Sequence, residues 1–550
     1  MRRFRYGVLG IVVAVGLALT PGLPASGEQA GPAAVAPGGP GALSHFDLAR
    51  KDCLGTARNR TSKVWYTVAG GVLSDVYFPT IDNTNVETLQ YVVTDGTTFT
   101  DLQTRDMTYT VRALDGSGSQ SASPATMACE VTATAKSGRY RIVTDYLTDP
   151  DRATVLLHTK FQPLVGSRAG YRLYVRFDTT VNGNGGGGPD NAGADSGVVD
   201  TTTDHPVPVA SDVNTATIAA NRDYAQPVFA ALRPSRPFTQ VSSGFVGSES
   251  DGLVQLDRDR ALNVVHDSAT GGNLVQTAQV DLARGPEVTL ALGFGATQTE
   301  AVGAAGASLA SRLDRLLDRY TAGWAVYDSG LRSPGRAFDG LPPATRQALT
   351  RAYYLSANVL KASEDKTFPG AIVASLASPW GQAVAAGNTT GTYFGSYREV
   401  FARDLYETFT GLLLDGDLAS ARDTVRFLFE RQQLPDGSMP RNSLVNGKPA
   451  PDTFGTQLDE VTYPILMALQ AGITDKAFYQ AHVKRAADFA ASHGPSFGAE
   501  SWEEQSGFSP STIAAEVAGL VAAATIADQA GDQASERVYR GVADDFQRSV

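Results

Sequence analysis

The sequence predicts two structural domains, an antiparallel β-sandwich followed by a helical toroid. The first half contains short runs of β-branched and aromatic residues separated by Asp-Gly turns, a pattern typical of antiparallel strands. The second half contains amphipathic segments joined by loops with Gly and Pro, which predict helices. A chain of 550 residues is too long for one hydrophobic core, so at least two domains are expected.

The N-terminus predicts export. Arginines within the first five residues precede an apolar run over residues 8–19, and Ala25-Ser26-Gly27 supplies small residues for cleavage. This pattern predicts a signal peptide over residues 1–27 and a protein that is secreted to the extracellular space. Residues 28–45 are rich in Gly, Ala and Pro without periodicity, which predicts a disordered leader.

Residues 46–298 are expected to form the sandwich. The clearest predicted strands cover residues 64–68, 91–94, 109–111 and 171–177. The two cysteines, Cys53 and Cys129, fall in this region. Export permits a disulfide between them, but two reduced, buried cysteines fit the sequence almost equally well.

Residues 299–340 are expected to be a helical linker. Residues 305–320 form one predicted helix, with leucines repeating along a single face. Residues 341–550 are expected to form the toroid, because pairs of helices are separated by long loops. The predicted helices cover residues 344–361, 398–415, 417–432, 457–471, 475–492, 510–529 and 532–550. The last one is still amphipathic at Val550, so we expect the chain to be part of a longer protein.

Composition limits the partners. The net charge of −11 and the pI near 5.1 argue against nucleic-acid binding, and an acidic chain suits a neutral ligand. No membrane association is expected after signal cleavage. The six histidines show no metal-ligand spacing, so no metal or other cofactor is expected to be required. A structural calcium ion held by Asp and backbone oxygens remains open, as does the oligomeric state.

The motif Trp502-Glu503-Glu504 precedes the predicted helix at 510–529. Two adjacent carboxyl groups oppose each other's ionisation, and an indole beside them excludes water, so both effects raise a carboxyl pKa. A raised pKa suits a general acid that protonates a glycosidic oxygen. Taken alone, the motif is more typical of a helix cap or a solvated surface than of a general acid.

Three further motifs lie at loop–helix junctions. Arg403-Asp404 can offer a fork of donors beside an acceptor pair for sugar hydroxyls, or form a simple surface ion pair. Gln432 precedes a Pro-Asp-Gly turn at residues 435–437. Gln457-Leu458-Asp459-Glu460 starts a helix, with Gln457 and Glu460 on one face that is either functional or merely solvated.

In this order the four motifs resemble the catalytic domain of glycoside hydrolase family 15. The stretches at residues 62–80 and 89–96 resemble the amino-terminal supersandwich of its bacterial members, the glucoamylases and glucodextranases. The similarity runs from about Gly41 to the end. It implies an antiparallel β-supersandwich followed by an (α/α)6 toroid. It also implies an inverting exo-glucosidase that releases glucose from the non-reducing ends of α-glucans.

The resemblance also implies residue roles. Glu503 is the expected general acid, with Glu504 and Trp502 contacting the substrate. Arg403 and Asp404 are expected to bind the hydroxyls of the terminal glucose. The resemblance places Gln457, Asp459 and Glu460 either in the wall of the pocket or in the layer of residues behind it.

An inverting site needs a second carboxylate, and the family supplies it from the second half of the barrel. No matching segment occurs in this sequence, so we expect the base to lie beyond Val550. We also expect only about the first half of the toroid here, and no activity from residues 1–550 alone. Glucoamylase activity on α-1,4 links is favoured. Glucodextranase activity on α-1,6 links and a non-catalytic carbohydrate-binding relative are the alternatives.

Overall fold

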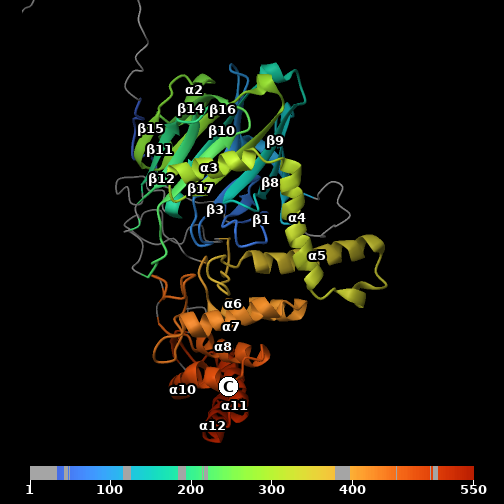
Figure 1. Ribbon diagram of the computed structural model, residues 1–550, viewed down its shortest axis with the longest axis vertical. Helices are drawn as coiled ribbons and strands as arrows, with labels where there is room; N and C mark the ends of the chain where they lie inside the picture. Colours follow the sequence, from blue (N-terminus) through green and yellow to red (C-terminus); the bar gives the residue numbers. More distant parts are fainter. Residues whose placement is uncertain are drawn as a thin grey trace, which may run out of the picture. The chain divides into compact units, whose positions relative to one another are not determined.

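The N-terminal half of the chain forms two antiparallel sheets that face each other, and the C-terminal half is helical (Figure 1). The computed structural model describes residues 34–42, 48, 50–114, 126–183, 194–213, 215, 221–377, 397–451, 453, 455–495, 497–499 and 506–549. These residues belong to one compact unit.

The first sheet has eight strands in the order β1-β2-β3-β4-β10-β16-β14, with β5 paired to β4. Its strands are rich in Val, Tyr and Thr, as predicted for the sandwich. Their bounds are β1 Cys53–Gly55, β2 Trp65–Ala69, β3 Val72–Tyr77, β4 Val86–Thr94, β5 Thr100–Leu102, β10 Arg172–Thr179, β14 Phe238–Phe245 and β16 Leu274–Val280.

The second sheet has nine strands in the order β15-β11-β12-β13-β17-β9-β8-β7-β6. Its members are β6 Met107–Ala113, β7 Cys129–Ala135, β8 Tyr140–Thr148, β9 Thr154–Pro163, β11 Asp195–Asp200, β12 Val207–Asp212, β13 Val228–Pro234, β15 Ser268–Gly272 and β17 Glu287–Gly295. Alternate residues of β7 and β8 are buried, and they meet side chains of the first sheet in one core. Two short helices accompany the sheets, α1 (Gln103–Asp106) and α2 (Gly252–Asp259).

The two cysteines are paired. Cys53 on β1 and Cys129 on β7 form a disulfide with a Cα–Cα distance of 6.6 Å. The bond therefore ties the edge of the first sheet to the second sheet, and it decides between the two alternatives that the sequence left open.

The segment at residues 34–42 corrects the prediction of a disordered leader. Val35 forms a bridge with Ser268, Ala36 is buried, and the Ala36 amide donates to the Ser268 carbonyl at 2.8 Å. The segment adds backbone hydrogen bonds to the edge of the sheet at β15, and such pairing does not require the side-chain periodicity that sequence patterns detect.

The predicted single helix over residues 305–320 is also wrong. The chain forms α3 (Gln298–Leu309) and α4 (Leu313–Gly330), with an extended residue, Arg312, between them. Helix α3 lies on the outer face of the nine-stranded sheet (Figure 1). A Cβ at Gly293 of β17 would lie 2.5 Å from the Ala301 carbonyl oxygen, so the lack of a side chain there permits this close approach.

The helical half contains every helix predicted for residues 341–550. Helices α6, α8, α11 and α12 pack in succession, and π-helical turns at Leu428–Gln432 and Tyr479–Val483 extend α7 and precede α10. The bounds are α5 Pro343–Ala362, α6 Ala402–Asp415, α7 Leu418–Phe427, α8 Leu458–Gln470, α9 Lys476–Phe478, α10 Lys484–His493, α11 Pro510–Gln529 and α12 Gln533–Gln547.

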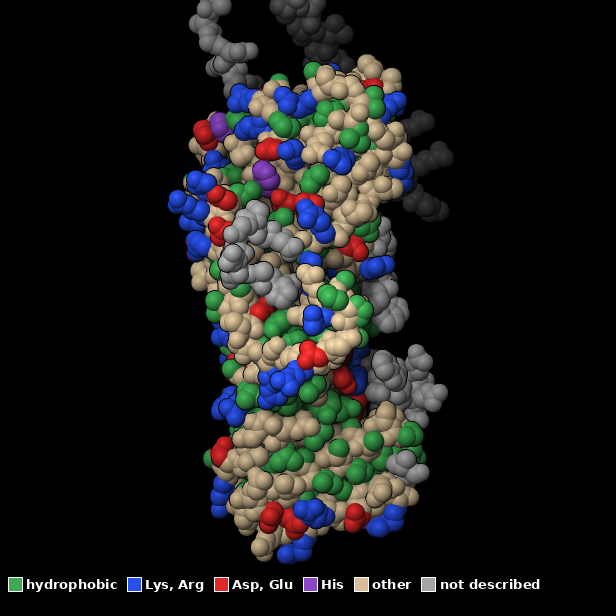
Figure 2. Space-filling view, turned by 90° about the vertical axis from the view of Figure 1, so that its right-hand side faces the viewer, with side chains coloured by type: hydrophobic (Ala, Val, Ile, Leu, Met, Phe, Trp, Pro, Cys, Tyr) green, Lys and Arg blue, Asp and Glu red, His purple; other side chains and the backbone are tan. Residues whose placement is uncertain are grey.

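Helix α11 is long and apolar enough to cross a membrane, but most of its apolar stretch is buried between other helices of the described chain. The space-filling view shows many hydrophobic side chains on one face of the helical half (Figure 2). Exposed apolar residues of this half include Leu355 and Val359 on α5, Leu414 on α6 and Val521 on α11. The outer surface of the helical half is therefore partly apolar.

The two halves are joined by buried polar contacts. The Trp65 indole donates to the Ala362 carbonyl at 2.9 Å. The Lys366 ammonium group donates to Thr56 Oγ1, to the Ala57 carbonyl and to the Ser62 carbonyl at 2.6, 2.8 and 2.5 Å. Burial lowers the pKa of Lys366 well below its usual value. Its three acceptors compensate for removing the amine from water.

Lys366→Met should lower the free energy of unfolding by about 2–4 kcal/mol, because three buried acceptors lose their donor. Calorimetric unfolding of the variant measures this loss. Lys448→Met is the matched control, since the Lys448–Asp223 pair is solvent-exposed and is expected to contribute at most about 1 kcal/mol. Equal effects of the two variants would contradict the assigned role of Lys366.

Candidate active site

Most of the described candidate residues lie where α6 and α8 begin. Helix α6 starts at Ala402 and has Asp404 in its first turn, and α8 starts at Leu458 with Asp459 and Glu460 in its first turn. Acidic side chains are favourable there because a helix N-terminus carries partial positive charge.

Arg403 joins the two helix ends. Its Nη1 donates to Gln457 Oε1 at 3.0 Å and to Asp459 Oδ2 at 2.8 Å, and lies 3.1 Å from Glu460 Oε1. The Arg403 backbone amide donates to Glu460 Oε2 at 2.9 Å. These four residues, Arg403, Gln457, Asp459 and Glu460, are named the Arg403 cluster below.

The Arg403 cluster is mostly buried. The side chains of Asp459 and Glu460 are 4% and 0% exposed, whereas that of Arg403 is 21% exposed. Burial raises the pKa of Glu460, and the Arg403 guanidinium opposes that rise. Burial alone would lower the pKa of Arg403. The negative charges of Glu460 and Asp459 have the larger combined effect, so the pKa of Arg403 is raised. The cluster therefore fixes a cation at the edge of a buried acidic pair.

Arg403 and Asp404, both described by the structure, do not form the ion pair with each other that the sequence allowed. Arg403 is directed at α8, while Asp404 is an exposed residue of α6. Asp404 offers an exposed carboxylate next to Arg403 in the chain, but the ion pairs of Arg403 that join the two helices are made to Asp459 and Glu460.

The surrounding loops are fixed by backbone pairing. Val400 and Ser443 exchange two backbone hydrogen bonds of 2.9 Å, and the side-chain amide Nε2 of Gln432 donates to the Val400 carbonyl at 3.3 Å. In the predicted Pro-Asp-Gly turn, Gly437 has a φ of +95°, and a Cβ there would lie 2.3 Å from the Arg485 carbonyl oxygen. The turn therefore requires glycine, in keeping with a structural role.

Trp502, Glu503 and Glu504 lie outside the described residues. The residues that flank them are described by their backbone: β18 (Phe497–Ala499) pairs antiparallel with β19 (Ser506–Gly507), and α11 follows from Pro510. The Ser509 side chain caps this helix by accepting from the Thr512 amide.

Two features near the cluster were missed from the sequence. The rings of Tyr406 and Tyr463 stack with centroids 4.6 Å apart, one turn beyond Arg403 and Asp459 on their helices. Glu516 is fully buried on α11. A signal existed for both: the tyrosines follow the motif residues at helical spacing, and Glu516 is an ionisable residue within an otherwise apolar helix.

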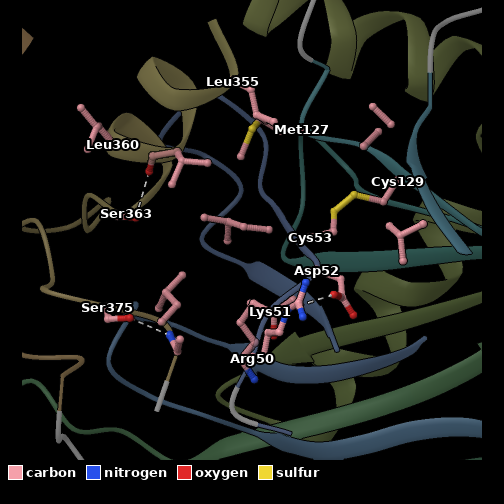
Figure 3. A pocket seen from close by; sticks show the side chains of 18 of the residues that line it. Arg50, Lys51, Asp52, Cys53, Met127, Cys129, Leu355, Leu360, Ser363 and Ser375 are labelled. Atoms are coloured by element: carbon pink, nitrogen blue, oxygen red, sulfur yellow. Dashed lines mark hydrogen bonds and ion pairs between the residues drawn. A yellow bond between two sulfur atoms is a disulfide. The ribbon is translucent and has the colours of Figure 1, made fainter. Parts of the chain in front are cut away.

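A cavity of about 600 Å³ lies elsewhere, between β1, β7 and α5. Figure 3 shows Leu355 and Leu360 of α5 beside it, with the Cys53–Cys129 disulfide in its wall. None of the described site residues lines this cavity. Within the described part of the chain, no group of three or more His, Cys, Asp or Glu residues is arranged to hold a metal ion.

Comparison with known proteins identifies both halves. Residues 36–329 match the family model described as glucodextranase, domain N, and residues 348–550 match that of glycosyl hydrolases family 15. The chain belongs to glycosyl hydrolase family 15. The family-15 chain is 34% identical over 512 residues to a glucoamylase from Clostridium sp. (strain G0005). The aligned region covers 93% of this chain and 66% of the relative.

A solved structure gives the same result. The family-15 chain matches a bacterial glucoamylase complexed with acarbose at a TM-score of 0.82 and 32% identity, over 94% of this chain and 69% of that one. The chain thus spans about two thirds of the length of both relatives. These matches confirm the family and the fold class predicted from the sequence, a β-sandwich followed by helices of an (α/α)6 barrel.

Arg403→Met should destabilise the family-15 chain by about 3–5 kcal/mol, because Asp459 and Glu460 would be left as buried carboxylates without a cation. Urea unfolding followed by circular dichroism measures the loss. The matched control is Arg426→Met, whose partner Glu430 and whose own side chain are both about half exposed, so a change of at most about 1 kcal/mol is expected. A variant at Arg403 as stable as this control would show that the cluster does not hold α6 to α8.

Proposed function

We propose that the family-15 chain belongs to an inverting exo-glucosidase, a glucoamylase that releases glucose from the non-reducing ends of α-glucans. The observation that carries the proposal is the Arg403 cluster, which places a fixed cation next to the exposed Asp404 at converging helix ends. The match to two glucoamylases supports it, and one of these was solved with acarbose bound.

Arg403 and Asp404 are proposed to bind the terminal glucose. A guanidinium and a carboxylate together offer donors and acceptors to neighbouring hydroxyl groups. The guanidinium cannot rotate freely, because Asp459 and Gln457 hold its Nη1. A fixed donor places the sugar ring in one orientation, which is the positioning that a hydrolase needs.

Glu503 is the proposed general acid. Its carboxyl proton passes to the glycosidic oxygen as the bond to C1 breaks, while a water attacks C1 from the opposite face and gives up a proton to a second carboxylate. The two carboxyl groups of an inverting enzyme lie about 6.5–9.5 Å apart, which leaves room for that water. Trp502 and Glu504 are proposed to contact the sugar beside Glu503, with Gln457, Asp459 and Glu460 behind Arg403.

The expected effect of Glu503→Gln is a fall in kcat of at least about 10²-fold, since an amide cannot supply the proton. Glucose release from maltose is measured with the protein encoded by the whole reading frame, because residues 1–550 span 66% of the Clostridium relative. Glu430→Gln, a surface change on the helix after α7, is the control. Proton NMR of the first product should show β-glucose, and nearly full activity of the Glu503 variant would refute the assignment.

Glucodextranase activity is the second candidate, because residues 36–329 match a model named for a glucodextranase domain. The same assay decides between the two. Faster turnover of isomaltose than of maltose would assign α-1,6 links. Binding of acarbose by the whole protein without turnover of either substrate would instead indicate a carbohydrate-binding relative.

Secretion is also proposed, and the Cys53–Cys129 disulfide supports it because disulfides persist in oxidising compartments. Expression in a bacterial host with its export machinery should yield protein in the periplasm or medium with a new N-terminus near Glu28. N-terminal sequencing measures the cleavage point. Retention of residues 1–27 on protein confined to the cytoplasm would contradict the proposal.

A further inference from the structure

A carboxyl group behind the Arg403 cluster lacks a hydrogen-bonding partner. Glu516, in the second turn of α11, is 0% exposed, and neither of its carboxyl oxygens is bonded to another group in the described chain. Thr512 lies one turn earlier on the same helix face. It is also buried, and its hydroxyl is likewise unpartnered.

The surroundings of Glu516 are largely apolar. On the α10 side, a Cβ built on Gly494 would lie 2.2 Å from Glu516 Oε1 and 2.5 Å from the Phe546 ring of α12. The backbone at Gly494 and the aromatic ring therefore close over the carboxyl group.

Helix α11 packs closely on α8 here: a Cβ built on Gly519 would lie 2.7 Å from Thr462 Cβ. Glu516 and Asp459 each lie three residues before these positions, and Asp459 is the charged residue that acts on Glu516. Asp459 in turn is paired with Arg403.

These surroundings favour the neutral acid. An ionised carboxylate without a hydrogen bond or counter-ion is too costly to bury, so the group keeps its proton instead. Asp459 acts in the same direction, because it is an anion bound to Arg403. Burial and the charge of Asp459 together raise the pKa of Glu516 to about 8.

We propose that Glu516 is a positioning residue for the Arg403 cluster, and that as a neutral acid it leaves Asp459 paired with Arg403. A neutral side chain on the α11 side of Asp459 does not compete for the guanidinium. An ionised Glu516 would repel Asp459 and attract Arg403 away from its present partners. The cluster should therefore be intact while Glu516 is protonated and weaken once it loses its proton. The consequence for sugar binding rests on the proposed function, but the proposed effect of Glu516 on Asp459 does not.

The first test needs no ligand. An unfolded glutamate loses its proton near its ordinary pKa of 4.5, whereas folded Glu516 keeps it to about pH 8. Folding stability that depends on Glu516 therefore falls as the pH rises from about 4.5 to about 8 and is constant above that range. Glu516→Gln, a neutral side chain of the same shape, removes this dependence.

The Tm of the wild type and of Glu516→Gln is measured from pH 4.5 to pH 9. The two should agree at the acid end, and the variant should become progressively more stable up to about pH 8. In an Asp459→Asn background the difference should shrink, because part of the repulsion is gone. Parallel curves, or a difference that Asp459→Asn leaves unchanged, would overturn the proposal.

The second test measures acarbose binding by calorimetry at pH 6 and pH 9, on the protein encoded by the whole reading frame. The Kd of the wild type should rise about tenfold between the two pH values, because an interaction that shifts a pKa by about one unit corresponds to about tenfold in affinity. The Kd of Glu516→Gln should change less than about threefold. Glu430→Gln should follow the wild type. Loss of binding by Glu516→Gln already at pH 6 would overturn the positioning role. If neither protein binds acarbose at either pH, the proposed function fails, and the Tm series still decides the role of Glu516.

Discussion

The arrangement of the helical half depends on one buried ionic cluster. Arg403 at the start of α6 is held by Asp459 and Glu460 at the start of α8, and both carboxylates are almost fully buried. Neither carboxylate could stay ionised there without the guanidinium, and the guanidinium could not be fixed without them. The ion pairs of Arg403 with Asp459 and Glu460 thus fix the starts of α6 and α8, and with them the positions of the exposed residues there.

The same ends of the helices supply nearly all of the candidate chemistry. Three of the four sequence motifs stand at or shortly before the first residues of α6, α8 and α11, and Glu516 lies in the second turn of α11. The contacts between α6 and α8 are specific because the Arg403 side chain and backbone amide bond to named groups of Gln457, Asp459 and Glu460. These interior contacts fix the backbone of α6, and so they also fix the position of solvent-facing residues such as Asp404.

The sequence predicted the fold well because its signals are local. Strand-forming runs such as those of β2 and β10, and the apolar periods of α8 and α12, depend on neighbours within one element. The break between α3 and α4 was missed because the leucines from Leu309 to Leu317 keep one period across it and still share one apolar cluster. The pairing of residues 34–42 was missed because backbone hydrogen bonds leave no side-chain pattern.

The site could be predicted only in part, for a similar reason. The helical spacing of Gln457 and Glu460 placed them on one face, and both do contact Arg403. The sequence could not show that Arg403 binds α8 rather than remaining a surface pair with Asp404, because that choice depends on how two helices pack. The neutral state of Glu516 likewise depends on α8, α10 and α12 together.

Trp65 has a consequence for how such proteins can recombine. It belongs to β2, yet together with Tyr77 it is part of the hydrophobic core of the helical half, and it donates to the Ala362 carbonyl. The sandwich therefore contributes side chains to the interior of its neighbour. The two halves are not interchangeable modules, and a chimera that exchanges the sandwich must also exchange the residues that receive Trp65 and Tyr77.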